Sequence, residues 1–233
     1  DQNVRKAIEM GIDKEGFCSV IMEGRGIPAK GAFPGSFSYG NDAVETVSYD
    51  PEEAKKLLEE SGWTDTDGDG YVDKDGQKLT INWLTYPTRL EQPKLAEYAQ
   101  ATLKEIGIDV SVNNTSDHRT YAENGEFDVY VSSLTTAPTG DPEYFFSSTV
   151  TGSKNYGNYQ NDEVTKLTEQ LHQTFDTDER GKLAVELQQK ILDDDAYFFV
   201  SHLNMGIVTK ANVTGMAAHP CDYYEITADL DVQ

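Results

Sequence analysis

The chain has 233 residues, enough for one large or two small domains, and its 37% of hydrophobic residues fit a globular protein with a buried core. No apolar run approaches the roughly 20 residues that a membrane-spanning helix needs. The formal charge of -22 excludes nucleic acid as a natural partner, because phosphate binding needs clustered Lys and Arg and the 19 present are spread over the chain. The acidity either favours cations as partners or serves only solubility.

The N-terminal part predicts helices separated by a long loop. Apolar residues recur at helical spacing over residues 4–8, and a second helix begins at Asp13. Residues 24–47 are rich in Gly, Pro, Ser and Asn, which predicts a loop of a length that is usually functional or disordered. A further helix is predicted from its N-cap at Asp50 to Gly62.

The middle of the chain predicts a βαβ unit. Residues 79–84 form a strand, residues 89–106 a helix with one apolar face, and residues 108–112 a second strand. Two strands joined by a helical crossover are expected to be parallel. A short polar helix at 118–123 and a strand at 127–131 follow.

The C-terminal part predicts two long helices and then strands. The helices cover residues 161–172 and 178–194, and the strands cover residues 197–203 and 206–208. Helices and strands alternate without an internal repeat, so the fold class is predicted to be α/β.

Alternating aspartates over residues 65–73 match the first nine positions of a calcium-binding loop. Carboxylates at alternate positions can converge on one cation, and Gly70 permits the sharp turn at the sixth position. The twelfth position is Gly76 rather than the Glu that completes the coordination shell. A Gly-rich hairpin whose aspartates cap turns is therefore the alternative. The candidate calcium ligands are Asp65, Asp67, Asp69, Tyr71 and Asp73.

The sequence has four histidines, which are His118, His172, His202 and His219. His219 precedes Pro220 and Cys221, so an imidazole and a thiol share one loop, and both can ligate transition metals. Metal ligation is a hypothesis for His219 and His202. The alternative is that each is a hydrogen-bonded structural residue, which is the usual role of a single histidine.

Motifs of catalysis do not occur in this sequence. It has no Gly-x-Ser-x-Gly elbow, no His-Glu-x-x-His pair, no Walker loop and no Gly-x-Gly-x-x-Gly fingerprint after a strand. Pairs of carboxylates are expected by chance among 41 Asp and Glu residues. The sequence therefore predicts a binding protein rather than an enzyme.

Four segments resemble, in the same order, the family 5 solute-binding proteins, which are the peptide- and nickel-binding receptors of ABC importers. Together they extend over nearly the whole chain. The segments are residues 4–15 with 24–31, residues 49–63 beginning Tyr-Asp-Pro-Glu-Glu, residues 103–110 (LKEIGIDV), and Asp141-Pro142 with the late strand 196–210.

The resemblance implies a fold, an architecture and a location. The fold would be a periplasmic-binding-protein-like lobe of type II, a mixed sheet flanked by helices, and the chain would be the C-terminal fragment of a longer receptor. Residues 1–196 would form the ligand-binding lobe, and residues 197–233 would return across the hinge toward the absent N-terminal lobe. The full-length protein would be a periplasmic or extracellular monomer anchored as a lipoprotein, would need no cofactor and would work with an ABC permease.

The resemblance also bears on the ligand. Peptide-binding members carry a Trp and, three residues later, an Asp that pairs with the peptide's α-amine, whereas Thr135 and Pro138 occupy those places here. Residues 137–142 are instead similar to the nickel-binding branch, in which a small chelator commonly holds the metal. The implied ligand is a nickel chelate or another metal chelate, a small molecule, or an oligopeptide.

Polar and aromatic residues after the strands are the candidates for lining the ligand cleft. Such groups fix the orientation of a ligand while aromatic faces supply apolar contact. The alternative for these residues is a polar loop surface, and the alternative function for the chain is a calcium-stabilised extracellular structural module. The candidate ligand-binding residues are Thr136, Thr139, Asn155, Tyr156, His219 and Tyr224.

Overall fold

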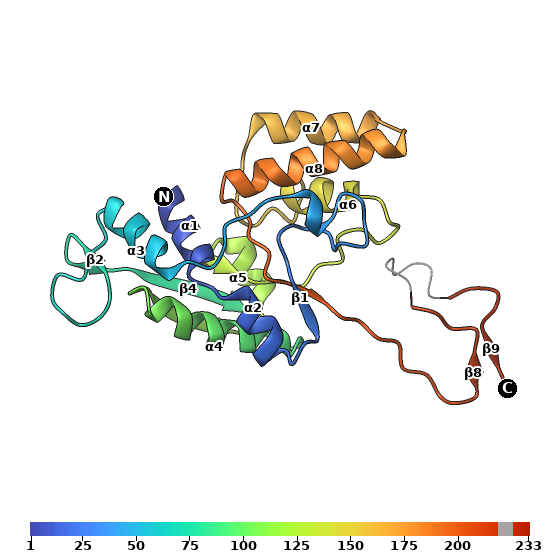
Figure 1. The fold of residues 1–233 in the computed structure, drawn as a ribbon, viewed down its shortest axis with the longest axis horizontal. Helices are drawn as coiled ribbons and strands as arrows, with labels where there is room; N and C mark the ends of the chain where they lie inside the picture. The colour runs from blue at the N-terminus through green and yellow to red at the C-terminus, as the bar shows by residue number, and fades with distance from the viewer. Residues whose placement is uncertain (219–225) are drawn as a thin grey trace. The chain divides into compact units, whose positions relative to one another are not determined.

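The computed structural model describes residues 1–218 and 226–233, which form two compact units (Figure 1). Unit 1 comprises Asp1–Pro28, Thr46–Leu134 and Ile191–Ser201, and unit 2 comprises Ala29–Glu45, Thr135–Lys190 and His202–Gln233. Both helices and strands occur, which confirms the predicted α/β class. Within the described residues no helix is long and apolar enough to cross a membrane.

Three helices of unit 1 begin after an aspartate whose side chain caps the first turn. Asp1 accepts a hydrogen bond from the backbone N–H of Asn3, Asp13 from that of Gly16, and Asp50 from that of Glu53, so each satisfies a donor that the first helical turn leaves unpaired. These helices are α1 (Gln2–Met10), α2 (Lys14–Gly16) and α3 (Pro51–Glu60). The π-helical turn η1 (Phe17–Ile21) directly follows α2.

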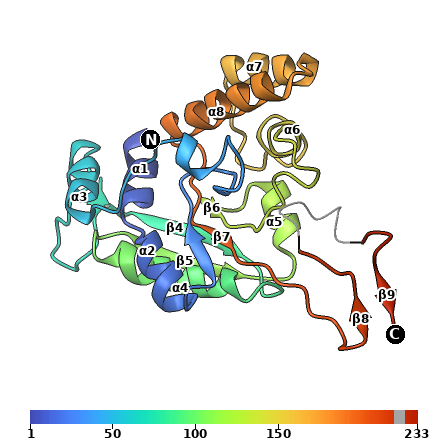
Figure 2. The same ribbon diagram turned by 45° about the vertical axis from the view of Figure 1, so that its right-hand side comes forward.

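A three-stranded parallel sheet forms the centre of unit 1. Its strands are β4 (Thr80–Thr85), β5 (Asp109–Asn114) and β6 (Val129–Tyr130), in the order β5-β4-β6. Helix α4 (Glu91–Lys104) connects β4 to β5, and Figures 1 and 2 both show it running beside these strands. The predicted parallel pairing is confirmed.

Apolar side chains from the helices and the sheet form one core in unit 1. Trp83 on β4 is fully buried, and the stripe of α4 that the sequence predicts to face inward includes the buried residues Leu95, Ala99 and Leu103. Burial of this apolar area from water is the main stabilising term, at roughly 25 cal/mol per Å². The core therefore holds the sheet and α4 as one body.

The aspartate-rich segment forms a hairpin against this core. β2 (Asp73–Lys74) pairs antiparallel with β3 (Gln77–Lys78), and Gly76 has a φ of 76° in the turn between them. The backbone N–H of Val72 donates to the carbonyl of Gly107, whose φ of 82° favours glycine. The hairpin is thus fixed to the turn that leads into β5.

Unit 2 is built around an aromatic cluster. The ring of Phe33 contacts Phe37, Tyr39, Phe145 and Phe146 at centroid distances of 5.0 to 6.5 Å. Edge-to-face contacts of this kind stabilise beyond the burial of area. The cluster therefore ties residues of the 24–47 loop to the helical segment that begins at residue 143.

The helical elements of unit 2 are η2 (Asn41–Ala43), α6 (Glu143–Phe145), η3 (Phe146–Val150), α7 (Asp162–Gln173) and the part of α8 (Thr177–Asp193) that ends at Lys190. Both views show α7 and α8 side by side, and Lys190 on α8 pairs with Glu163 on α7 at 2.5 Å. The α7 and α8 predictions are confirmed, while the helical turns α6 and η3 were not among the predicted elements.

The strands near the C-terminus differ from the prediction. The described strands there are β7 (Ser201–Leu203), β8 (Val213–Thr214) and β9 (Asp231–Val232), with β8 and β9 antiparallel. The strand predicted at 197–203 is confirmed over Ser201–Leu203, while residues 197–200 are irregular. The strand predicted at 206–208 is wrong, because those residues are irregular. Val208 is 96% exposed, so its β-branched side chain lacks the packing that strand propensity expresses.

Candidate functional site

The carboxyl ends of the parallel strands bring several polar side chains of unit 1 to one edge of the sheet. Tyr86 directly follows β4, His118 opens α5 (His118–Asn124) after β5, and Tyr130 ends β6. Ligands of open α/β sheets bind outside the carboxyl ends of the strands. We define Tyr86, Gln92, His118, Tyr130 and Ser133 as the sheet-edge cluster.

His118 is the centre of the aromatic part of the sheet-edge cluster. Its ring lies on that of Tyr86, with centroids 4.2 Å apart and planes 24° from parallel, and its Nδ1 lies 2.7 Å from the hydroxyl of Tyr130. Burial, and secondarily the charge of Arg119, lower the pKa of His118 below its ordinary value of 6.5. The imidazole is therefore neutral at pH 7, with one nitrogen as donor and the other as acceptor.

Ser133 connects the polar part of the cluster. Its backbone N–H donates to the hydroxyl of Tyr86 at 3.1 Å, and its Oγ accepts from Gln92 Nε2 at 2.6 Å and donates to Glu91 Oε1 at 3.0 Å. Gln92 is only 4% exposed, and its Oε1 has no hydrogen-bond partner among the described residues. A buried acceptor of this kind costs free energy until a donor meets it.

The sequence predictions did not include this cluster as a site. From the sequence, no binding role is predicted for His118, Tyr86, Gln92, Tyr130 or Ser133. The signal was present in the predicted βαβ unit, because the residues that follow its parallel strands must meet at one edge.

The predicted cleft residues that the structure describes lie on two loops of unit 2. Thr136 is half-buried and Thr139 exposed on the loop before α6, and Asn155 and Tyr156 are half-buried on the loop after η3. Asn155 donates to the carbonyl of Tyr159 at 2.8 Å and accepts from its N–H at 3.0 Å, which closes its own turn. The remaining two, His219 and Tyr224, lie outside the described residues.

His202 occupies a half-buried position in unit 2. Its Nε2 lies 3.3 Å from Oδ1 of Asn41, and burial lowers its pKa to about 4, so the ring is neutral at pH 7. In the described part of the chain, the one group of three or more His, Cys, Asp and Glu side chains close enough to hold an ion does not include it. The arrangement matches the structural alternative for this residue.

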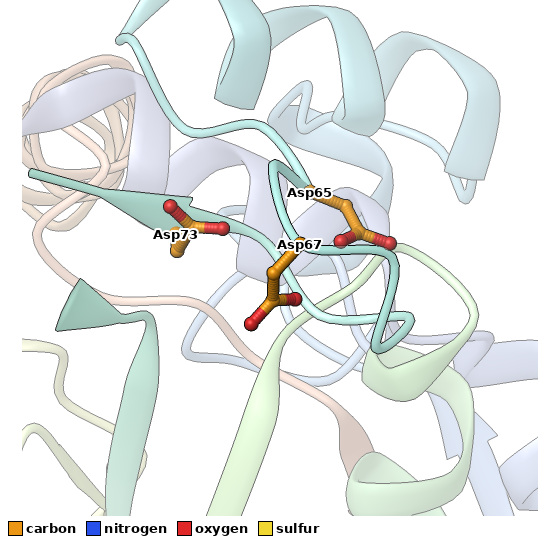
Figure 3. Close-up of side chains that lie close together, drawn as sticks. All are labelled: Asp65, Asp67 and Asp73. Carbon is orange, nitrogen blue, oxygen red and sulfur yellow. The ribbon is translucent and has the colours of Figure 1, made fainter. Parts of the chain in front are cut away.

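That group is formed by Asp65, Asp67 and Asp73 (Figure 3). One carboxylate oxygen from each lies within 4.8 Å of the others. Asp65 also accepts from the backbone N–H groups of Gly68 and Gly70, at 2.7 and 3.0 Å, while Asp73 accepts from the backbone N–H and hydroxyl of Thr66. These bonds shape the turn as the hairpin alternative expects.

Two further predicted calcium ligands have other contacts. The carboxylate of Asp69 pairs with Lys78 at 2.7 Å, and this hydrogen bond, with one from the backbone of Tyr71, holds the pKa of Asp69 below its usual value. Lys78 Nζ also lies 4.1 Å from the ring centroid of Tyr71. The side chain of Asp69 is thus engaged by an internal cation.

Residues 1–157 match the family described as bacterial extracellular solute-binding proteins, family 5 middle region. The chain belongs to this family. The resemblance carried by the four sequence segments is thereby confirmed.

The individual relatives align with almost the whole of this chain. Oligopeptide-binding protein AppA of Bacillus subtilis is 32% identical over an alignment that covers 97% of this chain and 43% of AppA. The nickel-binding periplasmic protein of Escherichia coli is 27% identical over an alignment that covers 93% of this chain and 43% of that protein. The structure of a nickel ABC transporter protein from Bacillus halodurans, 28% identical, superposes with a TM-score of 0.79 over 100% of this chain and 49% of that one.

This chain therefore spans less than half the length of the family 5 relatives it matches. The named relatives are binding proteins for peptides or nickel. They give no support to the alternative of a calcium-stabilised structural module.

Proposed function

We propose that the full-length protein is the substrate-binding component of an ABC importer. It captures a nickel chelate or an oligopeptide in a cleft between two lobes and delivers it to a membrane permease. Membership of family 5 supports the receptor role, and the sheet-edge cluster of unit 1 is the observation that carries the proposal for this chain.

The sheet-edge cluster offers the chemistry that a binding receptor needs. A neutral imidazole, phenol hydroxyls and a buried amide oxygen supply directed hydrogen bonds. Closure of a second lobe over such an edge excludes water, which strengthens each polar contact. The role of the cluster is thus to orient a ligand, and no cofactor is required for it.

Two cargo classes have support from different observations. The higher identity to the oligopeptide-binding relative, 32% against 27% for the nickel-binding one, favours a peptide. Thr135 and Pro138, which replace the groups that peptide-binding members use for the α-amine, favour a nickel chelate. Direct binding measurements separate the two.

The C-terminal segment has the surface expected of a return crossing. Met205 is 73% exposed and Val208 is 96% exposed, so apolar side chains are available for the lobe that this chain does not contain. This exposure supports the proposal that the segment beginning at residue 197 contacts the other lobe in the full-length protein. A monomer that works outside the cytoplasm, periplasmic or anchored as a lipoprotein, completes the proposal.

The test is calorimetric titration of the full-length protein with the 1:2 complex of Ni(II) and L-histidine and, separately, with a nonapeptide mixture. We expect saturable binding of one probe.

His118→Phe keeps a flat ring on Tyr86 but removes both ring nitrogens, and is expected to weaken that binding about tenfold, equivalent to about 1.4 kcal/mol. Lys182→Met, which changes an exposed side chain of unit 2 that pairs with Glu179, is the control. If neither probe gives a heat of binding, the receptor function is overturned.

A further inference from the structure

Arg180, in the first turns of α8, uses its entire guanidinium group within unit 2. Nε donates to Asp141 Oδ2 at 2.8 Å and Nη2 to Asp141 Oδ1 at 2.6 Å, which is the bidentate geometry that arginine and carboxylate favour. Nη2 also donates to Glu143 Oε2 at 2.9 Å, and Nη1 to the carbonyls of Leu171 and Thr174, both at 2.6 Å. Five hydrogen bonds match the five N–H groups of arginine.

This saturation decides what Arg180 can do. The side chain is only 13% exposed, and each of its donors already has an acceptor, so the group is not available to bind a ligand directly. Its acceptors belong to two separate segments: the Asp141 and Glu143 side chains at the start of α6, and the backbone at the end of α7. Arg180 therefore acts as a clamp between these segments.

The charges of the clamp are stable at neutral pH. Burial disfavours ionisation of Asp141 and Glu143. The hydrogen bonds and charge of Arg180, together with the backbone N–H of Glu143 at Asp141 and with His172 at Glu143, nevertheless hold the pKa of both carboxyls below the usual range. Glu143 receives a second contact from His172 Nδ1 at 2.7 Å. Both carboxylates thus remain acceptors for the guanidinium at pH 7.

The clamp fixes the end of the loop at residues 135–142. Asp141 Oδ1 also accepts from the backbone N–H of Glu143 at 2.9 Å, and the hydroxyl of Tyr39 donates to the carbonyl of Gly140 at 2.7 Å. The same loop carries Thr136 and Thr139, the residues predicted to meet the ligand. Its position relative to α7 and α8 therefore depends on Arg180.

We propose that Arg180 is the positioning residue of the ligand loop at residues 135–142, holding Thr136 and Thr139 in place through Asp141 and Glu143 without touching the ligand. The ligand part of this statement rests on the proposed function. Lysine cannot replace arginine here, because an ammonium group lacks the planar fork that reaches a carboxylate and two carbonyls at once.

Hydrogen exchange and ligand affinity, measured together on the full-length protein, test the proposal. The variants are Arg180→Lys, Arg180→Met and, as a milder change that keeps the arginine, Glu143→Gln. Lys182→Met is the matched control, because Lys182 lies on the same helix, is 72% exposed and pairs with Glu179. The probes are again the 1:2 Ni(II)–L-histidine complex and the nonapeptide mixture.

We expect backbone exchange in residues 135–142 to be about tenfold faster in Arg180→Lys, with a smaller effect in Glu143→Gln and none in Lys182→Met. Affinity for the probe that wild type binds should fall about tenfold in Arg180→Lys, at a temperature where exchange in β4 and α4 is unchanged. Unchanged exchange in the loop would overturn the proposal. If backbone hydrogen exchange in Arg180→Lys is faster throughout unit 2 while the affinity for the probe is unchanged, Arg180 has a structural role and does not position the ligand loop.

Failure of the proposed function gives a different result. If wild type binds neither probe, the receptor role is overturned, while the exchange of residues 135–142 still decides whether Arg180 holds the loop. If wild type binds and Arg180→Lys binds equally well, the receptor role stands and the positioning role is overturned.

Discussion

The imidazole of His118 is held between two tyrosines, stacked on Tyr86 with ring centroids 4.2 Å apart and hydrogen-bonded through Nδ1 to Tyr130 at 2.7 Å. These residues come from the end of β4, the start of α5 and the end of β6. One side chain thus joins all three segments that leave the carboxyl edge of the sheet.

The His118–Tyr130 hydrogen bond should be measurable as a coupling between two residues. His118→Phe and Tyr130→Phe each remove one partner and keep a ring, so each is expected to cost about 1 kcal/mol of stability. The double variant should cost less than the sum of the two, because the same bond is lost once. Urea denaturation of wild type and the three variants, as full-length proteins, measures the free energies of unfolding of this double-mutant cycle. If the two single losses add up to the loss in the double variant, the bond contributes nothing.

Glu9 and Lys14 form a buried ion pair in unit 1, at 2.6 Å, with side chains 3% and 11% exposed. Lys14→Met should destabilise the protein by about 3 kcal/mol, because it leaves the buried carboxylate with the Thr46 hydroxyl but without its cation. Adding Glu9→Gln should restore part of that loss by removing the charge. Thermal unfolding checks both, and a Lys14→Met protein as stable as wild type would contradict the prediction.

Burial of His202 predicts a dependence of stability on pH. The folded protein holds this imidazole at a pKa of about 4, against 6.5 as its ordinary value. Between these values the unfolded chain binds more protons than the folded one, so the free energy of unfolding falls as pH decreases from 6.5 to 4. The loss should be on the order of 2 kcal/mol.

The measurement for His202 is a series of urea denaturations across this pH window. His202→Asn, which keeps a polar contact toward Asn41 but cannot titrate, should lose less stability over the same window than wild type. Equal slopes in the two proteins would show that another group causes the dependence.

Asp65 should stabilise the hairpin through its two backbone hydrogen bonds rather than through an ion. Asp65→Ala removes the acceptor of Gly68 and Gly70 and should cost about 1 kcal/mol. The cost should be the same with millimolar calcium and with chelator, because Asp69 is paired with Lys78 and Gly76 supplies no twelfth-position carboxylate. Calcium that raises the melting temperature of wild type but not of Asp65→Ala would show that the ion binds.

Local signals predicted much of the secondary structure because they act within a few residues. The N-caps Asp13 and Asp50, and the strand and helix periodicities between residues 79 and 112, all produced elements at the expected places. The strand at 206–208 failed because β-propensity reflects packing against neighbours, and Val208 has almost none. The turns at 143–150 were missed because their aromatic residues are fixed by Phe33, far away in the chain.

The sequence by itself determined the family, the α/β class, the parallel pairing of β4 and β5 and the long helices of unit 2, since these follow from periodicity, caps and motif order. Only the tertiary structure decided which polar groups meet. The contact of Tyr86 with His118, the pairing of Asp69 with Lys78 and the clamp of Arg180 on Asp141 depend on side-chain directions and distances. Spacing along the chain does not fix those quantities, because they are set by how separate elements pack.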